Sequence, residues 1–153
     1  MSPRLVPIKI TSVMVAIDGS DHSKKAAEFA IEIAKLWNAQ LYFIHVLEET
    51  KIPNWFKGFA EVEQLGTEDY FEVADRRLFA PLIARAKESE IQSFRCIRAR
   101  GDPADEILRN ADRKEIDLIV MGSRGLGEFS RVFLGSVSNK VLSNAKCTCI
   151  TVK

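Results

Sequence analysis

Five short apolar runs alternate along the chain with four longer segments of helical periodicity. The apolar runs lie at residues 12–17, 40–47, 93–99, 116–121 and 147–152. Between the first two runs, apolar residues recur every three or four positions, as at Ala26, Ala30 and Ile33, which is the spacing of one helix face. Strands that alternate with helices favour a parallel sheet, because each crossover helix returns the chain to the same edge. We therefore predict an α/β fold, a three-layer α/β/α sandwich with a five-stranded parallel sheet.

The length and composition fit one such unit. The chain has 153 residues, of which 46% are hydrophobic and 28% are charged, values typical of a globular domain. We expect residues 1–153 to form a single domain, with residues 1–10 as an N-terminal arm. A net charge of +1 gives no general attraction to nucleic acid. The apolar runs are too short to cross a membrane, and the N-terminus lacks the apolar core of a secretory signal.

Several local signals set the expected helix boundaries. Ser20 or Asp21 is a good N-cap for the first helix, and Asn38 is expected to end it. The second helix is expected over Thr67–Ser89, with a kink or a division at Pro81. Asp102 and Pro103 mark the start of the third helix as its N-cap and first residue. The fourth helix is expected to present Leu134, Val137, Val141 and Ala145 as its apolar residues.

Glycines recur at a fixed spacing between the fourth strand and the last helix. Gly122, Gly125 and Gly135, the last followed by Ser136, let the backbone approach a ligand closely. A helix N-terminus beyond them offers unpaired N–H groups and a partial positive charge. We predict a phosphate site built from these amides, with the hydroxyls of Ser136 and Ser138. Arg124 and Arg131 are candidate charge partners; the alternative is a glycine-rich turn that caps a helix and binds nothing.

A second polar turn follows the first strand. Asp18 ends this strand on the side where ligands bind in doubly wound sheets. Its carboxylate could accept ribose hydroxyls or hold a divalent ion beside the phosphates, or it could simply cap the first helix. If the first and fourth strands are neighbours, the two turns flank one crevice. His45 lies within the second strand and is expected to be a packed, hydrogen-bonded core residue, and His22 a solvated residue of the first helical turn.

The remaining aromatic and sulfur side chains have structural interpretations. Trp55, Phe56 and Phe59 form an apolar cluster in the loop after the second strand, expected to be a small core beneath this loop. The alternative is a lid over the crevice or a partner surface. Cys147 and Cys149 lie two apart in the last strand and are expected to be buried thiols on one face. The alternative, a redox or metal role, is the less favoured.

The motifs of several enzyme classes are absent. The chain has no Gly-x-x-x-x-Gly-Lys-[Ser/Thr] motif, which excludes a P-loop triphosphatase. The pair Gly125 and Gly127 is followed by Ser130 where a dinucleotide fingerprint has glycine. No Gly-x-Ser-x-Gly elbow supplies a serine nucleophile.

Taken together, these residues resemble the universal stress protein family. The family motif Gly-x2-Gly-x9-Gly-[Ser/Thr] matches at Gly122, Gly125, Gly135 and Ser136. Further landmarks are residues 16–20, 45–46, 101–103 and 117–122. The resemblance implies a Rossmann-like, adenine-nucleotide-binding fold with strand order 3-2-1-4-5, and membership of the ATP-binding subtype. One departure is Cys147-Thr148-Cys149, where the family often has proline before its last apolar run.

The resemblance also implies a set of nucleotide-binding residues. The nucleoside side would be lined by Ala16, Ile17 and Asp18, with the backbone of Val46 at the adenine. The ribose and phosphates would be held by Met121, Gly122, Ser123, Arg124, Gly125, Gly135, Ser136, Val137 and Ser138. Magnesium or manganese is expected with the ATP, without direct protein ligation except at Asp18.

We therefore interpret the chain as a cytoplasmic, ATP-binding stress-response protein that acts as a nucleotide-dependent switch or sensor. Any ATP hydrolysis is expected to be slow, because no positioned base or arginine finger is evident. A homodimer through the last strand is implied by the resemblance, and no nucleic acid or membrane partner is expected. The alternative is a nucleotide-free homodimeric interaction module.

Overall fold

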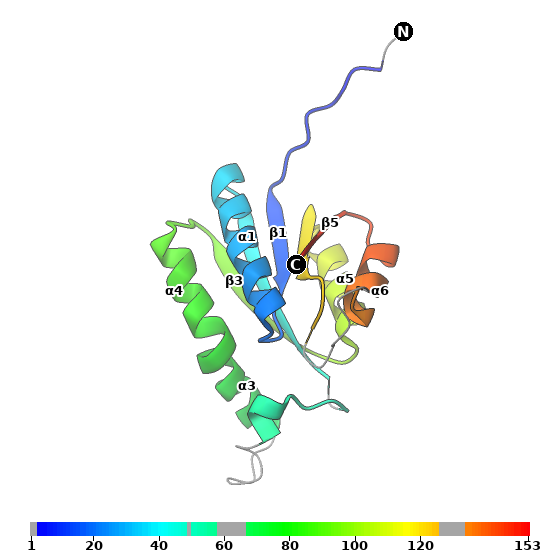
Figure 1. Ribbon diagram of the computed structural model, residues 1–153. Helices are drawn as coiled ribbons and strands as arrows, with labels where there is room; N and C mark the ends of the chain where they lie inside the picture. The colour runs from blue at the N-terminus through cyan, green and yellow to red at the C-terminus, as the bar shows by residue number, and fades with distance from the viewer. Residues whose placement is uncertain (1–2, 49, 58–66, 126–133) are drawn as a thin grey trace.

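The computed structural model describes residues 3–48, 50–57, 67–125 and 134–153. Its elements, in chain order, are β1 (Ser12–Ala16), α1 (Asp21–Trp37), β2 (Gln40–Leu47), α3 (Thr67–Ala74), the π-helical segment η1 (Asp75–Phe79), α4 (Ala80–Glu88), β3 (Phe94–Arg100), α5 (Pro103–Arg113), β4 (Leu118–Gly122), α6 (Ser136–Asn144) and β5 (Thr148–Val152). Residues 3–11 precede β1 without helix or strand, and residues 3–9 project away from the body (Figure 1). No helix within the described residues is long and apolar enough to cross a membrane.

The five strands form one sheet in the order β3-β2-β1-β4-β5, and all four pairings are parallel. The predicted fold class and strand order are therefore confirmed. Because the chain first winds from β1 to β3 and then restarts at β4, the winding reverses between β1 and β4. In open α/β sheets this reversal point, at the carboxyl ends of the strands, is where ligands bind.

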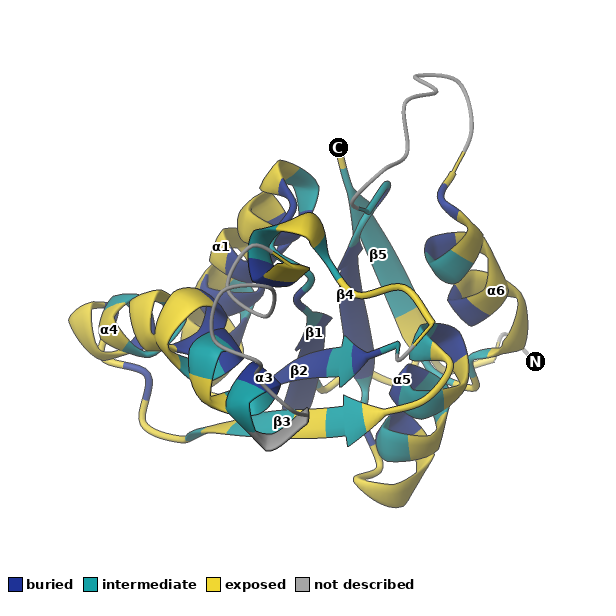
Figure 2. Cartoon of the chain, turned by 90° about the horizontal axis from the view of Figure 1, so that it is seen from below, coloured by how far each residue is buried: buried dark blue, intermediate teal, exposed yellow. Residues whose placement is uncertain are grey.

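Helices cover both faces of the sheet, as Figure 1 shows. On one face α1, α3, η1 and α4 pack over a core that includes Val13, Val15 and Phe43. On the other face α5 and α6 pack over Met14, Ile44 and other buried residues of a second core. The central strands are therefore buried on both sides, whereas the outer faces of the helices are exposed (Figure 2). Continuous apolar runs are the sequence pattern that such strands require.

The predicted helix boundaries are largely confirmed. Ser20 is the N-cap of α1 and accepts a hydrogen bond from the N–H of Ser23, and Asn38 ends the helix with φ of 50°. Asp102 caps α5 and Pro103 is its first residue. Around Pro81 the expected helix is divided, since η1 separates α3 from α4 and the N–H of Ala80 bonds five residues back to Asp75.

Other boundaries differ from the predictions by one to three residues. The fourth strand begins at Leu118, because the N–H of Ile116 still bonds to the carbonyl of Ala111 and closes the end of α5. The last strand begins at Thr148, so Cys147 precedes it. Leu134 lies outside α6 and is 44% exposed, so its expected place on the apolar helix face was wrong.

The cluster at Trp55 and Phe56 belongs to the main core. Phe56 is buried among the core residues on the α1 face, and Trp55 packs against the same cluster. Both rings contact Tyr70 of α3, with centroids 5.4 Å and 4.9 Å away. These two residues therefore extend the central core, rather than forming a separate small core. Phe59 and Arg131 lie outside the described residues.

Candidate functional site

The exits of β1 and β4 meet at the reversal point of the sheet. These two strands pair directly, with Val15 opposite Val120, as the prediction of one shared crevice required. Beyond the strands the turns stay close, because a β-carbon added at Gly125 would lie 2.7 Å from Oδ2 of Asp18. The absence of a side chain at Gly125 thus lets the loop after β4 pass against the carboxylate that follows β1.

The predicted nucleotide-binding residues all lie at this end of the sheet. Ala16, Ile17 and Asp18 end β1 or follow it, and Val46 is near the end of the neighbouring β2. Met121 to Gly125 end β4 and follow it, and Gly135 to Ser138 form the N-terminus of α6. The fold therefore brings together side chains and amides from four separate stretches of chain.

Asp18 shapes the turn before α1 and does not cap the helix. Its Oδ1 atom accepts a hydrogen bond of 2.8 Å from the N–H of Ser20, and Ser20 itself is the N-cap. Gly19 between them has φ of +87°, a conformation that glycine adopts without strain. The alternative that Asp18 serves simply as the helix cap was therefore wrong.

Helix α6 begins beside the end of β4 and is held there by two hydrogen bonds. The N–H of Gly135 donates to the carbonyl of Ser123 at 2.8 Å. The hydroxyl of Ser138 donates to the carbonyl of Gly122 at 2.7 Å, and this hydrogen bond fixes the first turn of α6 against β4. These bonds join the first turn of α6 to the two residues at the end of β4.

The N-terminus of α6 differs from those of α1 and α5. Ser20 and Asp102 place a side-chain oxygen on the first turns of α1 and α5, and acidic residues follow in both. At Gly135 no side chain within the described part of the chain makes a cap hydrogen bond, and the first turn of α6 has no acidic residue. The positive end of this helix dipole is thus left without a carboxylate or a capping oxygen from its own turn.

Gly122 has a packing role that the motif did not reveal. A β-carbon at this position would lie 2.8 Å from the carbonyl carbon and from Cβ of His22, and 3.0 Å from the N–H nitrogen of Ser23. Since the neighbouring atoms are mainly backbone, they cannot move aside easily. Glycine at the end of β4 therefore allows the first turn of α1 to pack directly against the strand.

His22 is the site residue that the sequence reasoning missed. It was expected on a solvated helical turn, but its Nδ1 lies 3.0 Å from the hydroxyl oxygen of Ser123. Its Nε2 lies 3.4 Å from Nη2 of Arg124. The first turn of α1 faces the end of β4, so the ring lies between two predicted phosphate-site residues. Only the strand order, which places α1 over β4, could have indicated this contact.

His45 is a buried core residue, as predicted, and it links β2 to the β1 exit. It is 2% exposed; its Nδ1 lies 2.6 Å from the carbonyl oxygen of Ile17, and its Nε2 lies 2.5 Å from the hydroxyl of Tyr70. Burial lowers the pKa of His45 and raises the pKa of Tyr70. The neutral imidazole therefore donates to Ile17 and accepts from Tyr70, which fixes the residue before Asp18.

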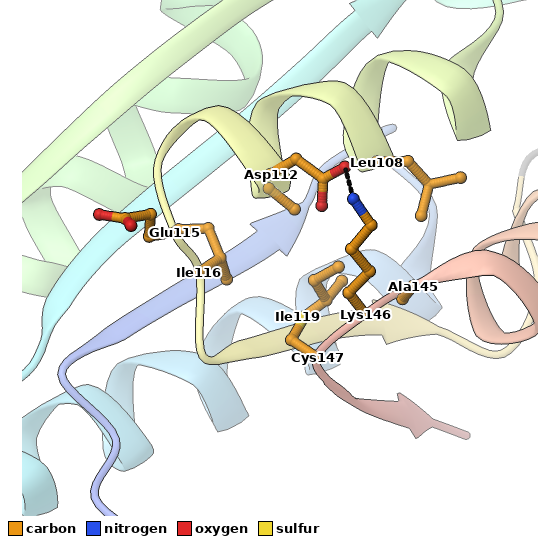
Figure 3. A pocket seen from close by; sticks show the side chains of 9 residues that line it. Leu108, Asp112, Glu115, Ile116, Ile119, Ala145, Lys146 and Cys147 are labelled. Atoms are coloured by element: carbon orange, nitrogen blue, oxygen red, sulfur yellow. Dashed lines mark hydrogen bonds and ion pairs between the residues drawn. The ribbon is translucent and has the colours of Figure 1, made fainter.

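Two cavities in the described part of the chain lie away from this site. One of about 160 Å³ is lined by Leu108, Ile116 and Ile119 among others, near the amino ends of β4 and β5. Figure 3 shows the side chain of Lys146 reaching toward Asp112 beside it, with Nζ 3.2 Å from a carboxylate oxygen. The second lies near the end of α1 and the start of β3. Both are at the edge of the sheet opposite the β1 and β4 exits.

The described residues contain no group of three or more His, Cys, Asp or Glu side chains that could hold a metal ion. Cys147 and Cys149 both pack against the core on the α5 face, as the same-face prediction required. They are only partly buried, which differs from the expectation of fully buried thiols. Burial raises the pKa of Cys149 to about 11, so this thiol stays protonated and unreactive near neutral pH.

Comparisons with known proteins agree with this architecture. A model described as the universal stress protein family matches residues 9–153. The chain is 34% identical over 145 residues to the Thermus aquaticus protein named "Universal stress protein in QAH/OAS sulfhydrylase 3'region", covering 93% of this chain and 98% of the relative. It is 37% identical over 146 residues to "Universal stress protein YxiE" of Bacillus subtilis, covering 92% and 97%. The solved structure of "Universal stress protein UspA from Lactobacillus plantarum" matches with a TM-score of 0.76 at 23% identity, covering 96% and 100%.

Proposed function

Because the chain belongs to the universal stress protein family, we propose that it binds ATP between the exits of β1 and β4. It would then act as a nucleotide-dependent switch or sensor in a stress response. Solved universal stress proteins of this fold are described in complex with cAMP, with dAMP and with AMP. These neighbours support adenine nucleotides as the ligand class, and the longer phosphate chain of ATP is our own extension.

The observation that carries the proposal is the N-terminus of α6. Its first amides lie beside the end of β4, and its first turn contains no acidic residue. Amides and dipole at such a terminus favour an anion. The glycine motif occurs at the same place. Because Gly125 has no side chain, the loop after β4 passes close to the Asp18 carboxylate without covering it.

Each predicted residue has a proposed role within this site. The β1 exit, from Ala16 to Asp18, would face the nucleoside, and the backbone of Val46 would meet the adenine. The segment from Met121 to Gly125 would follow the ribose and phosphates. The α6 N-terminus, from Gly135 to Ser138, would bind phosphate oxygens through its amides.

A divalent ion would accompany the ATP. The carboxylate of Asp18 lies against the glycine segment, with Oδ2 2.7 Å from the position of a β-carbon at Gly125, and carboxylate oxygens suit magnesium or manganese. The ion would neutralise phosphate charge. We propose that most of its ligands are phosphate oxygens and water, with Asp18 as the protein residue able to contact it.

Two further parts of the proposal concern turnover and assembly. Hydrolysis would be slow at most, because both histidines are unsuited to activate water. His45 is buried and hydrogen-bonded on both ring nitrogens, and the ring nitrogens of His22 face Ser123 and Arg124. Assembly would be a homodimer through β5, which is an edge strand with β4 on one side only. An edge strand offers backbone N–H and C=O groups for pairing with another chain.

Calorimetric titration with ATP and magnesium tests the proposal directly. We expect binding at millimolar or better affinity, and we expect Gly135→Val to remove it by placing a side chain against the phosphates. Gly135 has φ of −59° and ψ of 154°, which valine adopts readily, so the fold should survive. Leu134→Ala, at an exposed neighbouring position, is the matched control and should bind as the wild type does.

Two outcomes would reject the proposal. One is the absence of millimolar binding by a folded wild-type protein, which would favour the nucleotide-free interaction module. The other is unchanged ATP affinity in a folded Gly135→Val variant. Mass spectrometry of small molecules released from the purified protein by unfolding gives an independent test, since a retained adenine nucleotide would identify the physiological ligand.

A further inference from the structure

The ring of His22 touches two consecutive residues of the loop after β4. Its Nδ1 is 3.0 Å from the hydroxyl oxygen of Ser123, and its Nε2 is 3.4 Å from Nη2 of Arg124. His22 is on the first turn of α1, about a hundred residues earlier in the chain. The contact therefore couples the helix that follows the Asp18 turn to the loop that begins the glycine segment.

The chemistry of the two partners determines which nitrogen carries the proton in the neutral ring. A guanidinium has only donors, so the Nε2 atom facing Arg124 must accept. In a neutral imidazole one nitrogen accepts and the other carries the proton. Nδ1 is then the donor to Ser123. The Ser123 oxygen accepts this bond and keeps its own proton to donate elsewhere.

The backbone beneath the ring is firmly held. The position of a β-carbon at Gly122 lies 2.8 Å from His22 backbone and Cβ atoms, so helix and strand are in close contact. The next residue, Ser23, is 3% exposed and donates two hydrogen bonds to Ser20, from its N–H to the hydroxyl and from its hydroxyl to the carbonyl. Ser123 is also fixed, because its N–H donates to Val152 and its carbonyl accepts from Gly135. Among His22, Ser123 and Arg124, Arg124 has the longest and most flexible side chain, so a fixed partner reduces its conformational freedom most.

We propose that His22 is a positioning residue which holds the Arg124 guanidinium, and with it the Ser123 hydroxyl, toward the phosphates of a bound nucleotide. The inference rests on the proposed function, because it assigns the phosphate selectivity of that same site. In this arrangement the phosphate chain meets a guanidinium and a hydroxyl donor that are already in position before the nucleotide binds. The nucleoside gains neither, so the ratio of ATP affinity to adenosine affinity measures the contribution of His22.

Two substitutions test the contacts of the two ring nitrogens one at a time. His22→Gln places an amide oxygen or nitrogen at the position of Nε2, where its oxygen can accept from Arg124. His22→Asn places its amide at the position of Nδ1, where it can donate to Ser123 but cannot reach Arg124. Both variants have similar polarity and keep an amide side chain at the same partly buried position of the helix. A purely structural role would make their effects alike.

The experiment is calorimetric titration of wild type and both variants with ATP and magnesium, and separately with adenosine. We expect His22→Asn to lower the ratio of ATP to adenosine affinity about tenfold, the size of one charge-assisted hydrogen bond. His22→Gln should retain most of the wild-type ratio. In an Arg124→Ala background the two substitutions should no longer differ.

The outcomes distinguish this inference from the proposed function. If the wild type binds neither ATP nor adenosine, the proposed function fails and the inference fails with it. If the wild type binds ATP, but Asn and Gln variants have equal ratios, or the difference persists without Arg124, the positioning role is wrong while the proposed function stands. Urea unfolding of each variant shows whether a lost affinity reflects a lost fold.

Discussion

The two ends of the β1–β4 pair each carry an aspartate, and the two carboxylates serve different purposes. At the amino end Oδ2 of Asp117 accepts from the N–H and the hydroxyl of Thr11, at 2.7 Å and 2.8 Å, and from the N–H of Ser12 at 3.1 Å. At the carboxyl end Asp18 accepts from Ser20 through Oδ1 and directs Oδ2 at the bare backbone of Gly125. The first carboxylate ties two strands together, and the second faces the loop that we propose for phosphate.

The comparison extends to the surroundings of each aspartate. At the amino end the hydroxyl of Ser12 donates to the carbonyl of Glu115 and accepts from the N–H of Asp117, so further hydrogen bonds join β1 to the turn before β4. The carboxyl end has a helix without a side-chain cap at Gly135 and, in the described part of the chain, a buried Trp55 indole N–H that lacks a hydrogen-bond partner. The Asp117 carboxylate is thus used for bonds within the fold, whereas the carboxyl end retains an uncapped helix N-terminus and an unpartnered indole N–H, beside the point where ligands bind in such sheets.

The largest expected effect comes from Gly122→Ala, at the carboxyl end of β4, where the first turn of α1 packs directly against the strand. The new β-carbon would lie 2.8 Å from backbone and Cβ atoms of His22, so α1 or β4 must shift. We expect a loss of about 3 kcal/mol in the free energy of unfolding. Urea denaturation followed by circular dichroism measures it.

The matched control is Gly125→Ala at the second glycine of the motif. There the added carbon meets the tip of the Asp18 side chain at 2.7 Å, and this carboxylate can rotate away. We expect a stability change below about 0.5 kcal/mol, together with weaker ATP binding. Equal destabilisation by both substitutions would show that the two glycines share one structural role.

A smaller loss is expected from Tyr70→Phe, which breaks the buried link between α3 and the β1 exit. Tyr70 is 1% exposed and its hydroxyl is the donor to Nε2 of His45. Without it the imidazole nitrogen is buried with no donor, which costs about 2 kcal/mol in the free energy of unfolding. The same denaturation assay measures the change.

The other tyrosine supplies the control. Tyr42 is only partly buried on β2, with its ring beside the ammonium of Lys114. Tyr42→Phe should change the free energy of unfolding by less than about 0.5 kcal/mol. If Tyr70→Phe were equally mild, the His45–Tyr70 bond would contribute little to holding the β1 exit in place.

The fold was predictable because its signals are local and agree with one another. Continuous apolar runs such as Val13 to Val15 indicate strands buried on both faces, and Ser20, Asn38 and Asp102 are each chemically suited to end or begin a helix. The glycine spacing likewise identified the loop between β4 and α6. These features depend on residues a few positions apart, which is the range over which sequence patterns carry structural information.

The contacts of His22, Gly122 and Ser138 could not be predicted in the same way. Each depends on how α1 or α6 sits against the end of β4, over separations of 16 to about 101 residues. The motif identified Gly122 as a ligand-facing glycine, but its nearest neighbours are atoms of α1. Strand limits near Ile116 and Cys147 were missed because the apolar pattern continues through the turns that close the preceding helices.

The smallest effect is expected at the amino end, from Asp117→Asn, and it should depend on pH. Hydrogen bonds from Thr11 and Ser12 lower the pKa of Asp117 below the usual 3.8, so the charged form stabilises the folded state above that value. For this partly exposed group we expect the variant to lose about 1 kcal/mol at pH 7. As the pH falls below 3.8 and through the lowered pKa, the wild type takes up the proton and its advantage disappears. Paired urea titrations at pH 7 and pH 3 measure the difference, with Asp112→Asn, which breaks only a surface ion pair to Lys146, as the control. A difference that stays constant between the two pH values would mean that shape, rather than charge, joins β1 to β4 at this end.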